Sequence, residues 1–168
     1  MHRSKAADSI DPEALITALL DAFYAADVAR TLACCDDDIA LMVHLPVELF
    51  PHLARRRGKE AMAAMVELHA ARYSERRYEI TFMTADRQRV AVMLELSFTK
   101  RADGRAMHFT TGNFFTLRGG LVTEMHTFVD TVDMIEQVSG RDLVGPLLGD
   151  AGVLRPPALT PMPLTRAK

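Results

Sequence analysis

The chain has 168 residues, of which 49% are hydrophobic, and a formal net charge of −2 at pH 7. This length is enough for one domain with a buried core, and the near balance of charges gives no reason to expect nucleic acid or an anionic membrane as a partner. No apolar run approaches the ~20 residues of a membrane span, and the polar N-terminus has no apolar signal-peptide segment. Cys34 and Cys35 are adjacent, which suggests neither a disulfide nor a metal motif, so we expect a reduced, cytoplasmic protein.

The N-terminal part predicts two helices followed by a turn. Asp11, Pro12 and Glu13 carry the signals of a helix start, namely a capping side chain, a proline in the first turn and an acid at the positive helix end. Apolar residues then recur at helical spacing through residue 23. Asp27 is expected to cap a second short helix that runs through Cys35, and the three aspartates at 36–38 are expected to form a solvated turn.

The middle of the chain predicts a strand, a loop and a third helix. Residues 39–45 form a short apolar run that ends at His44-Leu45-Pro46, and residues 46–57 have the composition of a loop. Gly58 precedes the third helix. One stripe of that helix is expected to pack in the core: Met62, Met65, Val66 and His69.

From Tyr78 onwards the sequence predicts strands, and the stretch from Arg105 to Asp130 predicts a hairpin that turns at Arg118-Gly119-Gly120. Side chains alternate along a strand, so two apolar faces dotted with small polar groups are expected. They are Met107, Phe109, Thr111, Asn113, Phe115 and Leu117 on the first strand, and Leu121, Thr123, Met125, Thr127 and Val129 on the second. Such faces are typical of a ligand pocket, or of a sheet that is covered on both sides.

A short helix is expected at Val132–Val138, ended by Gly140, and five prolines lie between residues 146 and 163. We therefore expect one α+β domain at residues 1–140 and a proline-rich C-terminal tail at 141–168. Its segment from Pro146 to Pro163 is expected to lie extended over the body or over a partner subunit, because proline excludes regular helix and central strand. The helices precede a run of antiparallel strands, which is the α+β pattern.

This order of elements resembles the nuclear-transport-factor-2-like superfamily over roughly residues 12–140. The resemblance rests on three segments: A-D-V-A-R-T-L-A-C-C-D-D-D-I-A-L, then H-L-P followed by R-G-K-E-A-M, and finally T-G-N-F-F-T-L-R-G-G-L-V-T-E-M-H-T-F-V-D-T-V-D-M-I-E-Q-V-S-G. The third segment looks like the closing hairpin and last helix of SnoaL-like polyketide cyclases. The resemblance implies a cone-shaped, curved antiparallel sheet wrapped by three helices.

Two catalytic sets of the superfamily are not retained. Where ketosteroid isomerases have an aspartate base and a helix tyrosine, this chain has Leu45 and Leu19, and Asn113 takes the place of their second oxyanion donor. Where limonene epoxide hydrolases have an asparagine, a tyrosine, an arginine and two acids, this chain has His44, Met42, Leu94, Leu96 and Thr127. Steroid isomerisation or epoxide opening by those mechanisms is therefore not expected.

His44 and Asp130 remain as catalytic candidates. Asp130 is similar in place to the aspartate that SnoaL-like cyclases use at the end of the final strand, and the resemblance implies no metal or cofactor. His44 is a candidate base, because imidazole titrates near neutral pH. The structural alternatives are a histidine bonded to a backbone carbonyl and an aspartate that caps the following helix.

Two functional hypotheses follow. The chain is either a cofactor-free acid–base enzyme (cyclase, isomerase or dehydratase) acting on a small apolar, carbonyl-bearing molecule, or a non-catalytic ligand-binding or dimerisation module. In both cases we expect an enclosed apolar pocket with His44 at its wall, lined by Asn113, Thr127, Met125, Phe115 and Phe23. A homodimer is expected through the opposite, convex face of the sheet, where Phe114, His126 and Phe128 lie and where relatives often dimerise.

Overall fold

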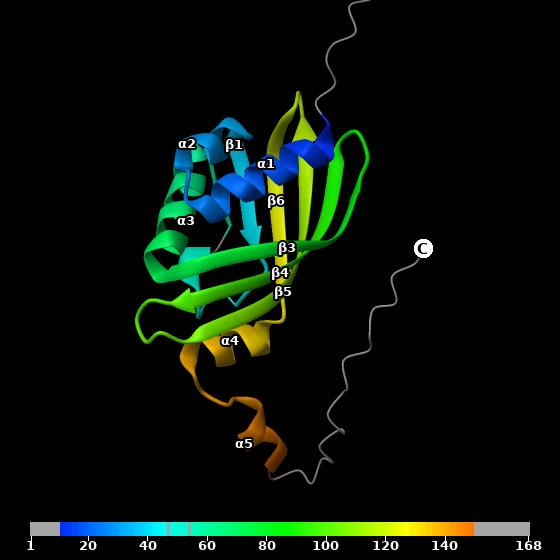
Figure 1. The fold of residues 1–168 in the computed structure, drawn as a ribbon. Coiled ribbons are helices and arrows are strands. Elements are labelled where there is room, and N and C mark those ends of the chain that lie inside the picture. The colour runs from blue at the N-terminus through cyan, green and yellow to red at the C-terminus, as the bar shows by residue number, and fades with distance from the viewer. Residues whose placement is uncertain (1–10, 47, 54, 150–168) are drawn as a thin grey trace, which may run out of the picture.

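The computed structural model describes residues 11–46, 48–53 and 55–149, and Figure 1 shows their arrangement. The helices of this part are α1 (Pro12–Ala25), α2 (Val28–Ala33), the 3₁₀ helix η1 (Pro51–Leu53), α3 (Lys59–Arg72), α4 (Thr131–Ser139) and α5 (Val144–Gly149). The strands are β1 (Cys35–Val43), β2 (Arg56–Arg57), β3 (Tyr73–Ala85), β4 (Arg89–Lys100), β5 (Ala106–Arg118) and β6 (Leu121–Val129). No helix in the described ranges is long and apolar enough to cross a membrane.

The strands form one curved six-stranded sheet in the order β2-β1-β6-β5-β4-β3. Helices α1, α2 and α3 gather at one side of the bent sheet, as Figure 1 shows, and this confirms the predicted α+β fold. One detail differs from the predicted antiparallel sheet, because β1 pairs with β6 in parallel while every other neighbouring pair is antiparallel. The parallel pair joins two segments that lie about 80 residues apart in the sequence. The sequence around each segment does not indicate which strand will pair with it.

The predicted helix starts are confirmed, whereas the boundary after the second helix is wrong. The carboxylate of Asp11 accepts a hydrogen bond from the Glu13 amide at 3.1 Å, and that of Asp27 accepts one from the Arg30 amide at 3.0 Å. Helix α2 ends at Ala33, and the three aspartates at 36–38 lie in β1 instead of a turn. Cations offset their charge there: Arg118 lies near Asp36 at 3.7 Å, Lys59 bonds Asp37 at 2.7 Å and Arg57 bonds Asp38 at 3.1 Å.

Side-chain alternation along β4 and β5 builds the core as predicted. The inward residues of both strands are buried: Val90, Val92, Leu94, Leu96 and Phe98 on β4, and Met107, Phe109, Thr111, Asn113, Phe115 and Leu117 on β5. Helix α1 covers them with Ile16, Leu19 and Leu20, and α3 contributes Met62 and Val66. Burial of these large apolar side chains is the main stabilising term of the fold.

Two β-bulges change the predicted alternation. The register shift between Ile80 and Phe82 turns Phe82 outward, where it is 52% exposed, and brings Met83 against the core. A second shift after Thr116 leaves Thr123 as an extra residue of β6, so that Val122 is buried in place of Thr123. A bulge inserts one residue on one strand only, and the parity of every residue beyond it is reversed.

The glycine turn of the hairpin is confirmed. Gly119 and Gly120 form a two-residue connection between β5 and β6, and their φ angles are +60° and +78°. A tight hairpin turn with positive φ at both central residues strongly favours glycine, because other L-residues are strained there.

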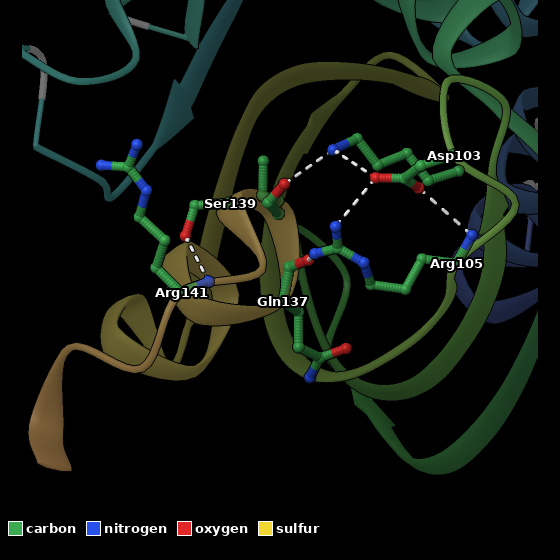
Figure 2. A network of polar contacts seen from close by, with 7 residues as sticks. Asp103, Arg105, Gln137, Ser139 and Arg141 are labelled. Carbon is green, nitrogen blue, oxygen red and sulfur yellow. Dashed lines mark hydrogen bonds and ion pairs between the residues drawn. The ribbon is translucent and has the colours of Figure 1, made fainter.

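Helix α4 is fixed to the end of the sheet by a polar network (Figure 2). Arg105 donates to the Gln137 carbonyl at 2.8 Å and to the Asp103 carboxylate at 2.8 Å, while Lys100 donates to the Val138 carbonyl at 2.8 Å. The Gln137 side-chain amide also pairs with the backbone N–H and C=O of His108. Cations at the carbonyl end of a helix complement its dipole, so the network holds α4 in place.

The C-terminal tail is described only as far as Gly149, and its proline-rich remainder at 150–168 lies outside the described residues. Residues 144–149 form the short helix α5, so the predicted extended conformation is wrong for this segment. Pro146 lies in the first turn of α5, where helical N–H groups have no intrahelical acceptor and a missing donor has little cost.

Candidate functional site

A partly open cavity of about 200 Å³ lies on the concave side of the sheet. Its walls come from the inner sides of α1, α3 and α4 and the inward faces of β4, β5 and β6. The ends of β1 and β3, the loop residues Leu45 and Phe50, and Leu53 of η1 complete them. Met134 and Val138 are the α4 residues of the wall, so the polar network at the C-terminus of that helix also fixes one wall of the cavity. The lining is mostly apolar, which is typical of small-molecule sites.

The five residues predicted to line a pocket all lie in its wall: Asn113, Thr127, Met125, Phe115 and Phe23. Phe115 is 2% exposed and Asn113 is 6% exposed. Alternation along β5 and the register with β6, which pairs Asn113 with Thr127 and Phe115 with Met125, bring four of them together.

A hydrogen-bonded polar cluster interrupts the apolar wall. The Asn113 amide donates to the Thr111 hydroxyl at 3.0 Å, and the Thr127 hydroxyl donates to the Asn113 carbonyl oxygen at 2.8 Å. The Asn113 amide has two donor hydrogens and each threonine hydroxyl has one, and the two bonds use two of these four. One amide N–H and one hydroxyl hydrogen therefore remain without an acceptor. The same number remains if the oxygen and nitrogen of the amide are exchanged. The cluster has spare donors and suits a ligand atom that accepts hydrogen bonds.

His44 does not line the cavity, and the prediction that it stands at the pocket wall is wrong. Its neighbours Val43 and Leu45 line the cavity, so the alternation of side chains turns His44 to the other side of the sheet. There its Nε2 lies 3.0 Å from His126 Nδ1, and its ring stacks on Phe128 with the centroids 3.9 Å apart.

The His44 interaction continues to a carboxylate on the same face. His126 Nε2 lies 3.0 Å from Glu124 Oε1, and this hydrogen bond holds the pKa of the Glu124 carboxyl below its usual value. Because His126 donates through Nε2 to the carboxylate, its Nδ1 accepts from His44. The chain Glu124–His126–His44 thus fixes the imidazole orientation on the convex face.

Asp130 lies at the N-terminus of α4 and acts as a helix cap. Its carboxylate accepts hydrogen bonds from the amides of Val132 at 3.0 Å and Asp133 at 3.1 Å. It is not among the residues that line the cavity. Asp130 is therefore the helix cap that was the structural alternative to a catalytic role. Neither His44 nor Asp130, the two catalytic candidates, lines the cavity wall.

His69 is the titratable residue of the wall that sequence analysis assigned only to the core. It lies in the last turn of α3, among the rings of Phe98, Tyr73 and Phe23 at centroid distances of 4.8, 5.1 and 5.3 Å. Burial, together with the nearby Arg76 guanidinium, lowers the pKa of His69 to about 4, so the imidazole is neutral at pH 7. Its helical spacing from Met62 and Met65 was the available signal, and it does not distinguish a core side from a cavity side.

A tyrosine pair on α1 and β3 stands beside His69. Tyr24 lines the cavity and stacks on Tyr78 with the centroids 4.9 Å apart, and the Tyr78 hydroxyl donates to the Asp21 carboxylate. Burial raises the pKa of Tyr24, so its hydroxyl stays protonated. The described residues contain no group of three or more His, Cys, Asp or Glu side chains that could hold a metal ion.

Comparison with known proteins identifies the family. The sequence profile of the SnoaL-like domain matches residues 16–125, which is more than half of the chain, and no curated protein matches the sequence. Among solved structures, a candidate polyketide cyclase from Silicibacter is 29% identical, with a TM-score of 0.60 over 74% of this chain and 93% of that one. A candidate isomerase from Rhodopseudomonas palustris is 24% identical, with a TM-score of 0.67 over 76% and 94%.

A third solved structure is TerC co-crystallised with polyporic acid, which is 16% identical to this chain. Its TM-score is 0.68 over 76% of this chain and 97% of TerC, so the likeness concerns the fold. The matched profile runs from α1 to the middle of β6 and covers most of the cavity wall described above, whereas α4 and α5 lie beyond it. On these grounds the chain belongs to the SnoaL-like family, within the nuclear-transport-factor-2-like fold.

Proposed function

We propose that this protein binds a small, largely apolar molecule that presents a hydrogen-bond acceptor, such as a carbonyl oxygen, inside the cavity. The observation that carries the proposal is the cluster of Asn113, Thr111 and Thr127, which keeps two spare donor hydrogens in a mostly apolar wall. A buried donor without a partner costs about 1–3 kcal/mol, so an acceptor on the ligand gains affinity here. TerC, co-crystallised with polyporic acid, supports the use of this fold for small organic molecules.

A second candidate function is cofactor-free acid–base catalysis on the same ligand, as a cyclase, isomerase or dehydratase. Two neighbours described as a polyketide cyclase and an isomerase support it. Catalysis needs a group in the wall that can move a proton, and neutral His69 meets that need better than His44 or Asp130, which lie elsewhere. Without turnover, the same cavity serves a non-catalytic binding module.

We also propose that the protein is a homodimer whose interface is the convex face of the sheet. Four large apolar side chains are exposed there: Phe82 at 52%, Met93 at 45%, Phe114 at 52% and Phe128 at 44%. The strand register joins them into one patch, because Phe82 pairs with Met93, Met93 with Gly112, and Gly112 with Phe128. A second copy of the chain is the natural cover for a patch of this kind. A reduced, cytoplasmic setting remains part of the proposal, in line with the free thiols of Cys34 and Cys35.

Binding of 1-tetralone, a bicyclic ketone, tests the proposed function. The wild-type chain is expected to bind it measurably by calorimetry, and Asn113→Leu, which removes the amide while keeping the branched shape, is expected to weaken binding by about tenfold. Equal affinity of the wild type and of Asn113→Leu would contradict the assignment of the polar cluster.

A further inference from the structure

The cavity has a second polar position, which the proposed carbonyl ligand does not use. His69 lines the wall inside an aromatic cage, and its ring lies 4.8 Å from Phe98 and 5.9 Å from Tyr24, measured between centroids. Among the described residues, the Nδ1 atom of His69 is one of the buried side-chain atoms that have no hydrogen-bond partner. Buried polar atoms in native proteins are nearly always paired, so an unpaired imidazole in a cavity wall indicates a partner that enters with the ligand.

This position is well separated from the cluster around Asn113. The cage reaches the sheet through Phe98, whose ring lies 6.1 Å from that of Phe109 on β5. Asn113 lies four residues farther along the same strand, which is about 13 Å at the usual rise of a β-strand. Thr111 of the cluster lies between Phe109 and Asn113 on this strand, so the cluster spans part of that distance, and His69 and the Asn113 amide lie toward different ends of the cavity.

The protonation state of His69 determines what it can bind. The imidazole is neutral, because burial and the charge of Arg76 oppose a second positive charge. The hydroxyls of Tyr24 and Tyr73, whose rings pack beside that of His69, are protonated as well, since burial raises both pKa values. A neutral imidazole has one donor and one acceptor nitrogen, and a hydroxyl group can pair with either of them.

We propose that the cavity selects a ligand with a carbonyl-type acceptor at one end and a hydroxyl group at the other, and that His69 is the residue that recognises the hydroxyl. This inference rests on the proposed function and adds the second polar end of the ligand. The apolar body of the ligand lies between the two ends, against the aromatic and aliphatic wall. His69 is thus a specificity-determining residue, and Asn113 is the anchor of the carbonyl end.

A pair of matched probes tests the inference. The ketones 1-tetralone and 6-hydroxy-1-tetralone share one bicyclic body, and the second has a hydroxyl on the far ring from the carbonyl. Calorimetry at pH 7 is expected to give an affinity about tenfold higher for the hydroxylated ketone with the wild-type chain. In His69→Phe, which keeps an aromatic ring in the cage, both ketones are expected to bind equally. His69→Gln keeps a polar group and is expected to restore part of the preference.

Two controls separate the roles of the polar ends. Asn113→Leu is expected to weaken the binding of both ketones by a similar factor and to keep the preference for the hydroxylated ketone. His108→Phe makes the same exchange at an exposed histidine that bonds Ser97, and it should leave both affinities unchanged. Circular dichroism and the unfolding midpoint check that each variant is folded.

Three results would count against the inference. Equal binding of the two ketones by the wild type overturns it, and so does a preference that persists in His69→Phe. If 1-tetralone and its hydroxyl derivative both fail to bind the wild type, the proposed function itself fails, and the inference falls with it. The first two results leave the proposed binding of ketones in place and contradict only the role of His69.

Discussion

The concave and convex faces of β4 and β5 are made from alternate residues of the same two strands, yet they differ in almost every physical respect. On the concave face Leu94 is 1% exposed and Phe115 is 2% exposed, and the polar Asn113 is paired with its neighbours. On the convex face Met93 and Phe114 are 45% and 52% exposed. One face is completed by helices of the same chain, and the other has apolar groups that the single chain leaves uncovered. The comparison assigns ligand binding to the first face and assembly to the second.

The neighbouring pair Phe115 and Phe114 gives the largest expected difference between the faces. Phe115→Ala removes a buried ring and is expected to lower the free energy of unfolding by about 3–5 kcal/mol, whereas Phe114→Ala should cost less than about 1 kcal/mol in the monomer. Urea unfolding at low chain concentration measures both. Similar losses in the two variants would contradict the assignment of the faces.

The pH dependence of stability tests the burial of His69. In the unfolded chain its pKa is about 6.5, and in the folded chain it is about 4, so folding favours the neutral form. The stability from this residue is complete above pH 6.5 and is lost as the pH falls from 6.5 towards 4. The difference between the two pKa values corresponds to roughly 3 kcal/mol in the free energy of unfolding.

Urea unfolding at pH 7 and at pH 4.5 measures this loss. His69→Phe cannot titrate, so it is expected to lose less stability than the wild type between the two pH values. His108→Phe, on the exposed face, serves as the matched control and should behave like the wild type. An unchanged pH dependence in His69→Phe would show that His69 is not held neutral in the folded chain.

The convex face is tested by its effect on assembly. Phe128→Glu places a charge in the apolar patch beside Phe114, whose ring lies 5.7 Å away, and is expected to raise the dimer dissociation constant by about 30-fold or more, or roughly 2 kcal/mol. Light scattering over a concentration series measures the shift. A wild type that stays monomeric at high micromolar concentration would refute the proposed dimer.

The smallest expected effect concerns the cap at Asp130. Asp130→Ala removes the acceptor for two amides of α4 and is expected to lower stability by about 1 kcal/mol, whereas Asp130→Asn retains a capping oxygen and should cost less. Ketone affinity should stay within about twofold in both variants, as calorimetry can check. A loss of binding in the asparagine variant would restore a direct role of this carboxylate at the site.

Much of this fold could be predicted because its signals are local. The caps Asp11 and Asp27, the turn at Gly119-Gly120 and the alternation along β5 each depend on a few consecutive residues. Four of the five cavity residues followed from strand alternation together with the family resemblance, and Phe23 followed from the helical spacing of apolar residues in α1.

The errors arose where the outcome depends on long-range register. His44 faces outward because β1 pairs with β6 in a register that places Val43 opposite Thr127. No local feature of the sequence determines that register. The bulge at Thr123 puts Val122 in the core where Thr123 was expected, and the bulge at Thr81 turns Phe82 outward, for the same reason. His69 was missed because helical spacing assigns a residue to the inner face of α3 without showing that the inner face borders a cavity.

The most direct test of the account compares the affinity of 1-tetralone for three chains: the wild type, Asn113→Leu and His44→Phe. Asn113 belongs to the polar cluster of the concave cavity, and His44 lies on the convex face against His126 and Phe128. The account predicts binding that is about tenfold weaker in Asn113→Leu and unchanged within about twofold in His44→Phe. Weaker binding in His44→Phe together with wild-type affinity in Asn113→Leu would contradict the assignment of the ligand site to the concave face.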